Sequence, residues 1–170
     1  TEDSPTVVEV GQEHTEKGNP VYTFSHYSPM QEFGRDSAVS GQLVDWGVMY
    51  EKILSDIHNG TWEPYDLWWF AEHGAAKLGA SFDEPINSKF VDQLKAISVK
   101  TDDLGTLSVY DLVMKRYEQM KQGRDVFDPY TGPIYDNTGK LILKEGERAD
   151  KEHHWSIDYY VDNVVGEIPR

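Results

Sequence analysis

The stretch AVSGQLVDWGVMYEKILSDIHNG, residues 38–60, decides the fold class. Residues 38–44 are apolar enough for a buried strand, and an apolar repeat at three- and four-residue spacing begins directly after them. The repeat consists of Trp46, Met49, Tyr50, Ile53, Leu54 and Ile57. Gly60 stands where a C-terminal cap ends a helix. A strand that passes into an amphipathic helix predicts an α/β fold, with the apolar stripe of the helix facing the core.

The same alternation of helix and strand continues toward the N-terminus. Residues 1–18 predict a helix that begins at Asp3 or Ser4, because both are good N-cap residues. Residues 21–24 (VYTF) predict a short strand, and residues 25–30 (SHYSPM) predict a loop. Strand ends in α/β sheets commonly build binding sites, so this loop is a candidate.

Toward the C-terminus the pattern becomes more helical. Residues 67–70 (LWWF) are an apolar run of strand length. Apolar spacing predicts helices over residues 90–97 and 109–120, with residues 100–105 as a polar connection between them.

The last third of the chain predicts a hairpin. Residues 137–139 (NTG) carry the turn signal between two strand-like runs, residues 130–136 and 140–144. Residues 155–165 are apolar and aromatic enough to cover or complete a sheet.

Charge and composition exclude several classes of partner. The chain has 30 acidic against 16 basic residues and a net charge of −14, so it repels phosphate backbones and anionic lipid. We therefore expect no nucleic-acid partner and no membrane-surface binding. It has no cysteine, which excludes disulfides and thiolate chemistry. Neither a membrane-spanning stretch nor a leader is visible, and because the first residue is Thr1 we expect a processed or truncated product.

Catalytic and metal-binding motifs are weak. The sequence has no Gly-x-Ser-x-Gly elbow, phosphate loop or His-Glu-x-x-His motif. His153 and His154 with Asp158 form a poor metal site, because adjacent histidines point in different directions on regular structure. A nucleoside-cleaving hydrolase would need a second acid near Asp45, and the sequence places none there. We predict no enzyme activity, no metal and no cofactor.

Aromatic residues are the more informative signal. Five Trp and ten Tyr suit flat ligands such as heteroaromatic or sugar-like molecules, although any single Trp can equally be packing. Asp45 and Trp46 stand out because they lie where the predicted strand ends and the predicted helix begins. There a carboxylate can accept from a ribose hydroxyl or a base N–H beside a stacking ring. An Asp at that position is also an ordinary helix N-cap, and both interpretations stay open.

Taken in order, several segments resemble one protein family, the basic membrane protein family of ABC-transporter substrate-binding proteins, whose members include purine nucleoside receptors. The resemblance covers nearly the whole chain and corresponds to the C-terminal half of that family. The segments that carry it are Thr1-Glu2-Asp3-Ser4-Pro5, Val21–Phe24 with the loop ending Ser28-Pro29-Met30, Asp45-Trp46-Gly47 with Tyr50, Asn59-Gly60-Thr61-Trp62, Phe127–Ile134 and Tyr160–Pro169.

The resemblance implies a fold and a function. The fold is the C-terminal part of a type I periplasmic-binding-protein-like, two-lobed Rossmann-like sandwich, and residues 1–170 lack the first lobe's opening strands and helices. The implied function is the extracytoplasmic solute-binding component of an ABC transporter. Such a protein binds a nucleoside, nucleobase or similar heteroaromatic solute in an inter-lobe cleft and delivers it to an ABC permease. The implied location is periplasmic or at the cell surface, as a lipoprotein anchored through an N-terminus that is absent here.

The resemblance also suggests the ligand-binding residues. Asp45 would hydrogen-bond the solute, Trp46 would stack on it, and Ser25, His26 and Tyr27 would form the wall on this lobe. Trp69 is a further candidate contact.

The sequence departs from the family pattern at three positions. Pro29 replaces an acidic residue, and Trp69 and Phe70 replace glycines and add bulk to the pocket. The alternative function is therefore a protein–protein interaction domain with an occluded ancestral cleft. A half-protein would also expose a sheet edge, so we expect self-association, by exchanged strands.

Overall fold

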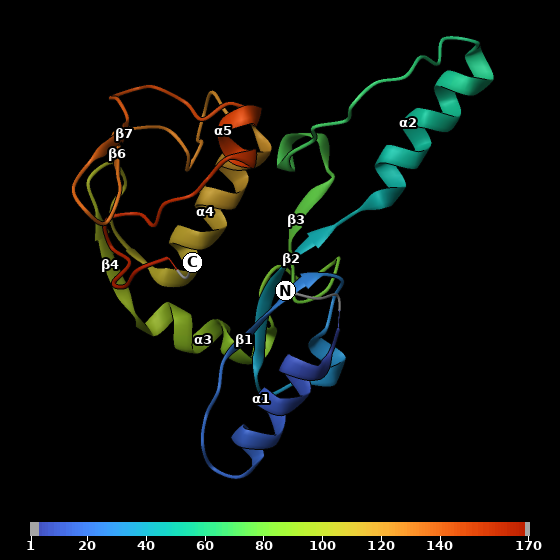
Figure 1. Cartoon of the computed structure of the whole chain (residues 1–170). Helices are drawn as coiled ribbons and strands as arrows, with labels where there is room; N and C mark the ends of the chain where they lie inside the picture. Colours follow the sequence, from blue (N-terminus) through green and yellow to red (C-terminus); the bar gives the residue numbers. More distant parts are fainter. Residues whose placement is uncertain (1–3, 169–170) are drawn as a thin grey trace. The chain divides into compact units, whose positions relative to one another are not determined.

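A computed structural model describes residues 4–168, which form two compact units (Figure 1). The first unit ends at Gly123 and the second begins at Arg124. Residues 1–3 and 169–170 lie outside the described part, and with them the predicted Asp3 cap and the ends of two family-like segments. The mixed α/β class predicted from the sequence is confirmed, and it agrees with part of a periplasmic-binding-like protein.

The first unit is built on a three-stranded sheet with the order β1-β2-β3. β1 (Thr23–Tyr27) pairs in parallel with β2 (Ala38–Val44), and β3 (Ala76–Leu78) pairs antiparallel with β2. The central strand, β2, has the bounds predicted from its sequence, and its first four residues are all buried, as expected for a strand covered on both faces. The predicted loop at residues 25–27 is wrong, because β1 continues through Tyr27.

Helix α1 (Thr6–Glu16) packs on the sheet through small side chains. A Cβ atom at Gly11 would lie 2.7 Å from Thr23 Cγ2, so only glycine allows this approach. Val8 forms a buried cluster with Met30 and Ala38. The 3-10 helix η1 (Gln31–Phe33) lies in the connection between β1 and β2.

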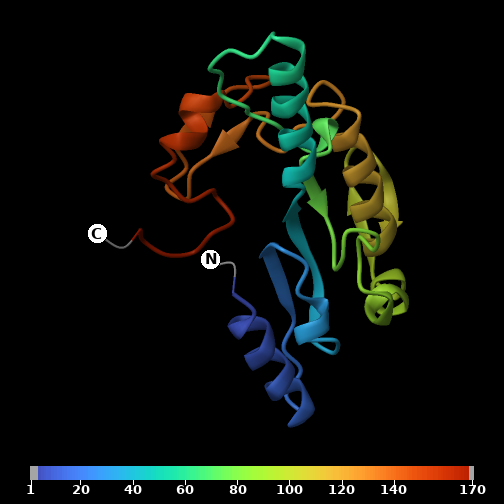
Figure 2. The same ribbon diagram turned by 90° about the vertical axis from the view of Figure 1, so that its right-hand side faces the viewer.

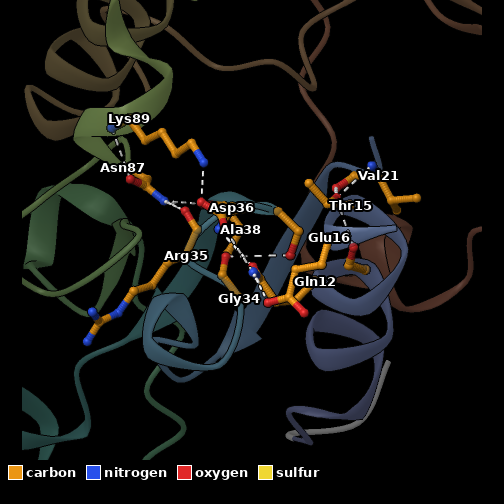
Figure 3. Close-up of polar contacts among 12 residues, drawn as sticks. Gln12, Thr15, Glu16, Val21, Gly34, Arg35, Asp36, Ala38, Asn87 and Lys89 are labelled. Atoms are coloured by element: carbon orange, nitrogen blue, oxygen red, sulfur yellow. Dashed lines mark hydrogen bonds and ion pairs between the residues drawn. The ribbon is translucent and has the colours of Figure 1, made fainter. Parts of the chain in front are cut away.

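A polar network ties α1 to the start of helix α3 (Ser88–Ala96), as Figure 3 shows. Gln12 donates to Asp36 Oδ2 at 2.9 Å and accepts from the Asp36 N–H at 2.8 Å. Asp36 also forms an ion pair with Lys89, and Asn87 donates to the carbonyl of Ala38 at 2.8 Å. The network fixes the connection into β2 against two helices.

Helix α2 (Trp46–Asn59) follows β2 directly and extends away from the end of that strand in both views (Figures 1 and 2). Its start at Asp45 and its end at Gly60, where φ is 69°, are as predicted. The predicted core-facing stripe is wrong, because no residue of α2 is buried. The helix projects beyond the sheet, so the sheet has no surface to cover its apolar face.

Residues 61–70, which connect α2 to η2 (Ala71–His73), have no regular secondary structure. The predicted strand over residues 67–70 is therefore wrong. Leu67 and the three aromatic residues after it are half-buried. These apolar side chains pack within an irregular segment. A short apolar run looks the same in the sequence whether it forms a strand or such a segment.

The rest of the first unit contains the two predicted helices and a hairpin that the sequence did not suggest. β4 (Ser98–Thr101) and β5 (Gly105–Ser108) pair antiparallel between α3 and α4 (Val109–Lys121). Residues 100–105, predicted as a polar connection, form the tight turn of this hairpin and the strand ends on either side of it.

The second unit has the predicted hairpin, with shorter strands than expected. β6 (Ile134–Tyr135) pairs with β7 (Leu141–Leu143), and Asp136 Oδ1 accepts from the backbone N–H groups of Thr138 and Lys140, both at 2.9 Å. Helix α5 (Lys151–Trp155) follows. Residues 155–165 add a single bridge, between Val161 and Asp136, and Trp155 is 74% exposed, so they cover the hairpin only in part.

Candidate functional site at the ends of β1 and β2

Two aromatic rings meet at the carboxyl ends of the parallel strands β1 and β2. Tyr27 is the last residue of β1, and Trp46 begins α2 just after β2. Their ring centroids are 6.3 Å apart at an interplanar angle of 71°. Both rings remain accessible, with Trp46 50% and Tyr27 43% exposed. His26 stacks on Tyr27 at 3.9 Å. The structure thus brings together three of the residues predicted as ligand contacts.

The backbone at Tyr27 is unusual. Its φ is 67°, the left-handed region, and it is the only non-glycine residue with positive φ in residues 4–168. The Ser28 N–H donates to the His26 carbonyl at 2.9 Å and closes a three-residue turn around Tyr27. A bulky residue in this region costs of order 1–3 kcal/mol, and such strain clusters at functional sites.

Asp45 uses both carboxylate oxygens within the protein. Oδ1 accepts from the Gly47 N–H at 3.1 Å, which confirms the N-cap interpretation, and Oδ2 accepts from Lys77 Nζ at 2.7 Å. The Lys77 ammonium chiefly, and the cap bonds to a lesser degree, hold the pKa of Asp45 below its ordinary value of 3.8. The carboxylate is therefore a permanent anion near neutral pH, and each oxygen keeps a further lone pair for a ligand.

Lys77 is the residue of this candidate site that sequence reasoning missed. It lies on β3, 32 residues from Asp45, and the register that pairs Lys77 with Leu43 brings its ammonium group to the end of β2. No local signal in the sequence could have found this pair, because it depends on the pairing of strands that are distant along the chain.

Ser25 lies apart from the aromatic group. Its hydroxyl is buried and has no hydrogen-bond partner among the described residues, and it occupies the space where a Gly41 Cβ would stand. Ser25 and Lys77 both line an open, mostly apolar cavity of about 620 Å³ beside α4. Its other lining residues are Phe24, Gly41, Gln42, Ala71, Ala76, Leu78, Leu112, Val113, Arg116, Tyr117 and Met120.

Trp69 lies in the irregular segment before η2. Its ring stacks on His73 with centroids 5.4 Å apart and an interplanar angle of 10°, and the described ring contacts join it neither to Tyr27 nor to Trp46. Phe70 also lies against His73, at 6.4 Å. Neither ring lines the cavity beside α4.

The histidines of α5 make contacts inside the second unit. His153 Nε2 lies 2.8 Å from the Tyr159 hydroxyl, and the His154 ring meets Tyr130 edge to face. Burial chiefly, with Arg124 nearby, lowers the pKa of His154. Across residues 4–168 no three acidic or histidine side chains gather closely enough to hold a metal ion. In the same range no helix combines the length and the apolar character needed to cross a bilayer.

Comparison with known proteins points to a class of binding protein. No family model matches the chain. A purine-binding protein of Brucella abortus (strain 2308) is 25% identical over 150 residues, which are 88% of this chain and 36% of that protein. A Haloferax volcanii protein named as an ABC transporter glucose-binding protein is 26% identical over 168 residues, 99% of this chain and 34% of that protein. The chain thus spans about a third of the length of the curated relatives it matches.

These relatives support a substrate-binding family and a solute-binding role, and their names describe binding proteins rather than enzymes. The two names give different solutes, so the similarity selects no particular one.

Proposed function

We propose that the chain is part of the extracytoplasmic solute-binding component of an ABC transporter, and that it binds a nucleoside, nucleobase or similar heteroaromatic solute at the carboxyl ends of β1 and β2. In this function it delivers the solute to an ABC permease and performs no chemistry on it. The purine-binding relative and the order of the family-like segments support the ligand class.

The observation that carries the proposal is the pair of accessible rings, Tyr27 and Trp46, beside a fixed carboxylate. Strand ends at the edge of an α/β sheet are the usual place for ligands. A flat ring can stack on Trp46 while the edge of Tyr27 limits its position, and Asp45 can accept from a ligand N–H or hydroxyl. Lys77 holds that carboxylate in place, so it acts on the ligand through Asp45.

His26 supports this group by stacking on Tyr27. Ser25 and Trp69 stay predictions as ligand contacts, since Ser25 lines the cavity beside α4 and the Trp69 ring stacks on His73. The alternative function, an interaction domain, is favoured by one separate observation, the uncovered apolar face of α2.

Isothermal titration of the protein with purine nucleosides, nucleobases and sugars tests the proposal. We expect one-to-one binding to a heteroaromatic member of the panel, weakened about 5- to 150-fold by Trp46→Leu because stacking contributes about 1–3 kcal/mol for a flat base. Trp62→Leu is the matched control, since Trp62 is equally exposed, at 50%. We expect this control to bind like the parent protein.

Two outcomes would contradict the proposal. One is tight binding that Trp46→Leu and Trp62→Leu weaken equally, which would place the ligand elsewhere. The other is no binding to any member of the panel while circular dichroism shows a folded protein.

A further inference from the structure

The cavity beside α4 is a second place in the first unit that can hold a small molecule. It is open, has a volume of about 620 Å³ and is lined by residues of the β1-β2-β3 sheet, η2 and α4. This volume lies within the range of about 300–1,000 Å³ that is common for ligand pockets. The residues described as lining it include none of Tyr27, Asp45 and Trp46, so it is separate from the site proposed above.

The wall of this cavity is apolar because its two charged side chains form ion pairs with residues outside the wall. Lys77 donates to Asp45 Oδ2 at 2.7 Å, and Arg116 donates to Asp103 Oδ1 at 2.7 Å. Long basic side chains commonly cover apolar surface with their carbon stems while the charged group stays in a polar setting. No acidic side chain is among the residues described as lining the cavity. A charged ligand would lose its hydration here and meet only cations that are already paired, so we expect a neutral ligand.

One polar group of the wall has no partner among the described residues. Ser25 is only 8% exposed, and its hydroxyl forms no hydrogen bond there. The hydroxyl oxygen stands over Gly41, since a Cβ atom on that glycine would lie 1.9 Å from it, and both residues line the cavity. A hydroxyl removed from water without a partner costs free energy, which an acceptor on a ligand would recover. Ser25 can therefore donate to a carbonyl oxygen of a bound molecule.

We propose that the cavity beside α4 binds a neutral, apolar molecule with one carbonyl acceptor, such as a ketone, whose oxygen accepts from the Ser25 hydroxyl. The hydrocarbon part of the ligand lies against α4, whose lining side chains fall on one side of the helix. They are Leu112, Val113, Arg116, Tyr117 and Met120. This site does not depend on the binding of a heteroaromatic solute at the ends of β1 and β2.

Isothermal titration with 2-nonanone and with nonanoate, which have chains of the same length, is the first test. We expect one-to-one binding of 2-nonanone with a dissociation constant on the order of 10–1,000 μM, from the efficiency typical of small ligands. Nonanoate should bind at least about tenfold more weakly, because its charge loses hydration in an apolar cavity. Tighter binding of nonanoate would overturn the proposal. The absence of saturable 2-nonanone binding to protein that circular dichroism shows to be folded would also overturn it.

Two substitutions on α4 test where the ketone binds. Leu112→Asp puts a carboxylate into the apolar wall and should weaken 2-nonanone binding at least about fivefold. Met114→Asp is the matched control, because Met114 is also half-buried on α4 and is not among the lining residues. We expect this control to change the binding less than about twofold. Equal effects of the two substitutions would place the ketone elsewhere and overturn the proposal.

Ser25→Ala tests the hydrogen bond. It should weaken 2-nonanone binding about three- to tenfold, the contribution expected of one neutral hydrogen bond. Urea unfolding of the ligand-free variant should show no loss of stability, since the hydroxyl that is removed has no partner among the described residues. Trp46→Leu should leave 2-nonanone binding unchanged, which separates this site from the proposed one. Binding that Ser25→Ala leaves unchanged, or that Trp46→Leu weakens equally, would overturn the proposal.

Discussion

At the scale of single residues, Tyr27 links conformation to the proposed site. Its backbone turn directs the chain away from the sheet at the end of β1, and its ring meets Trp46. The ring is too exposed to contribute much to the core. A tyrosine held in a left-handed conformation at a ligand site is expected to cost stability and to serve binding.

Replacing Tyr27 with asparagine tests this balance. Asparagine tolerates positive φ, so Tyr27→Asn should raise the free energy of unfolding by about 1 kcal/mol. It should also weaken heteroaromatic binding, because the ring beside Trp46 is lost. Urea unfolding and calorimetric titration of the same samples give both quantities. A variant that is less stable and binds normally would show that the turn is merely structural.

At the scale of elements, Asp45 joins three pieces of secondary structure. It follows β2, caps α2 and pairs with Lys77 of β3. A helix that projects beyond its sheet depends on this junction more than a helix packed along its length. The same carboxylate thus serves the fold before any ligand is considered.

Two substitutions separate the cap from the ion pair. Asp45→Ala loses both and should lower the free energy of unfolding by about 1–2 kcal/mol. Asp45→Asn keeps a good cap and should lose less than about 1 kcal/mol.

The pH dependence of this difference follows from the lowered pKa of Asp45. The stabilising contribution is complete above the ordinary pKa of 3.8 and disappears as the pH falls through the lower folded value. The gap between parent and Asp45→Asn, measured by urea unfolding, should therefore be constant from pH 7 to about 5 and close below pH 4. A gap that persists at pH 2 would mean that the ion pair is not its source.

At the scale of the whole molecule, net charge is the dominant electrostatic feature. A chain with −14 destabilises its own compact state by self-repulsion. Salt bridges such as Lys77–Asp45 offset the repulsion between acidic groups only locally. Added salt should therefore weaken much of the remaining repulsion by screening it.

Sodium chloride should accordingly raise the melting temperature. Most of the rise should occur below about 0.3 M, because the Debye length has already shortened to about 10 Å at 0.1 M. Thermal unfolding followed by circular dichroism checks this at one fixed protein concentration. A melting temperature that falls with salt would show that attractive pairs outweigh the net repulsion.

The sequence by itself determined the elements whose signals are local. The span of β2, the start of α2 at Asp45 and its end at Gly60, the helices α3 and α4 and the turn of the second hairpin all depend on contacts within a few residues. Local spacing and capping chemistry predict such elements, and three of the predicted site residues, His26, Tyr27 and Trp46, also proved to be neighbours.

Only the tertiary structure decided what depends on pairing between distant segments. The Lys77–Asp45 pair follows from the register of β2 and β3, and the strained turn at Tyr27 follows from β1 continuing past the predicted strand. The apolar face of α2 was visible in the sequence, but whether anything covers it was not. Periodicity tells which face of a helix is apolar, and only the path of the rest of the chain tells whether that face is buried.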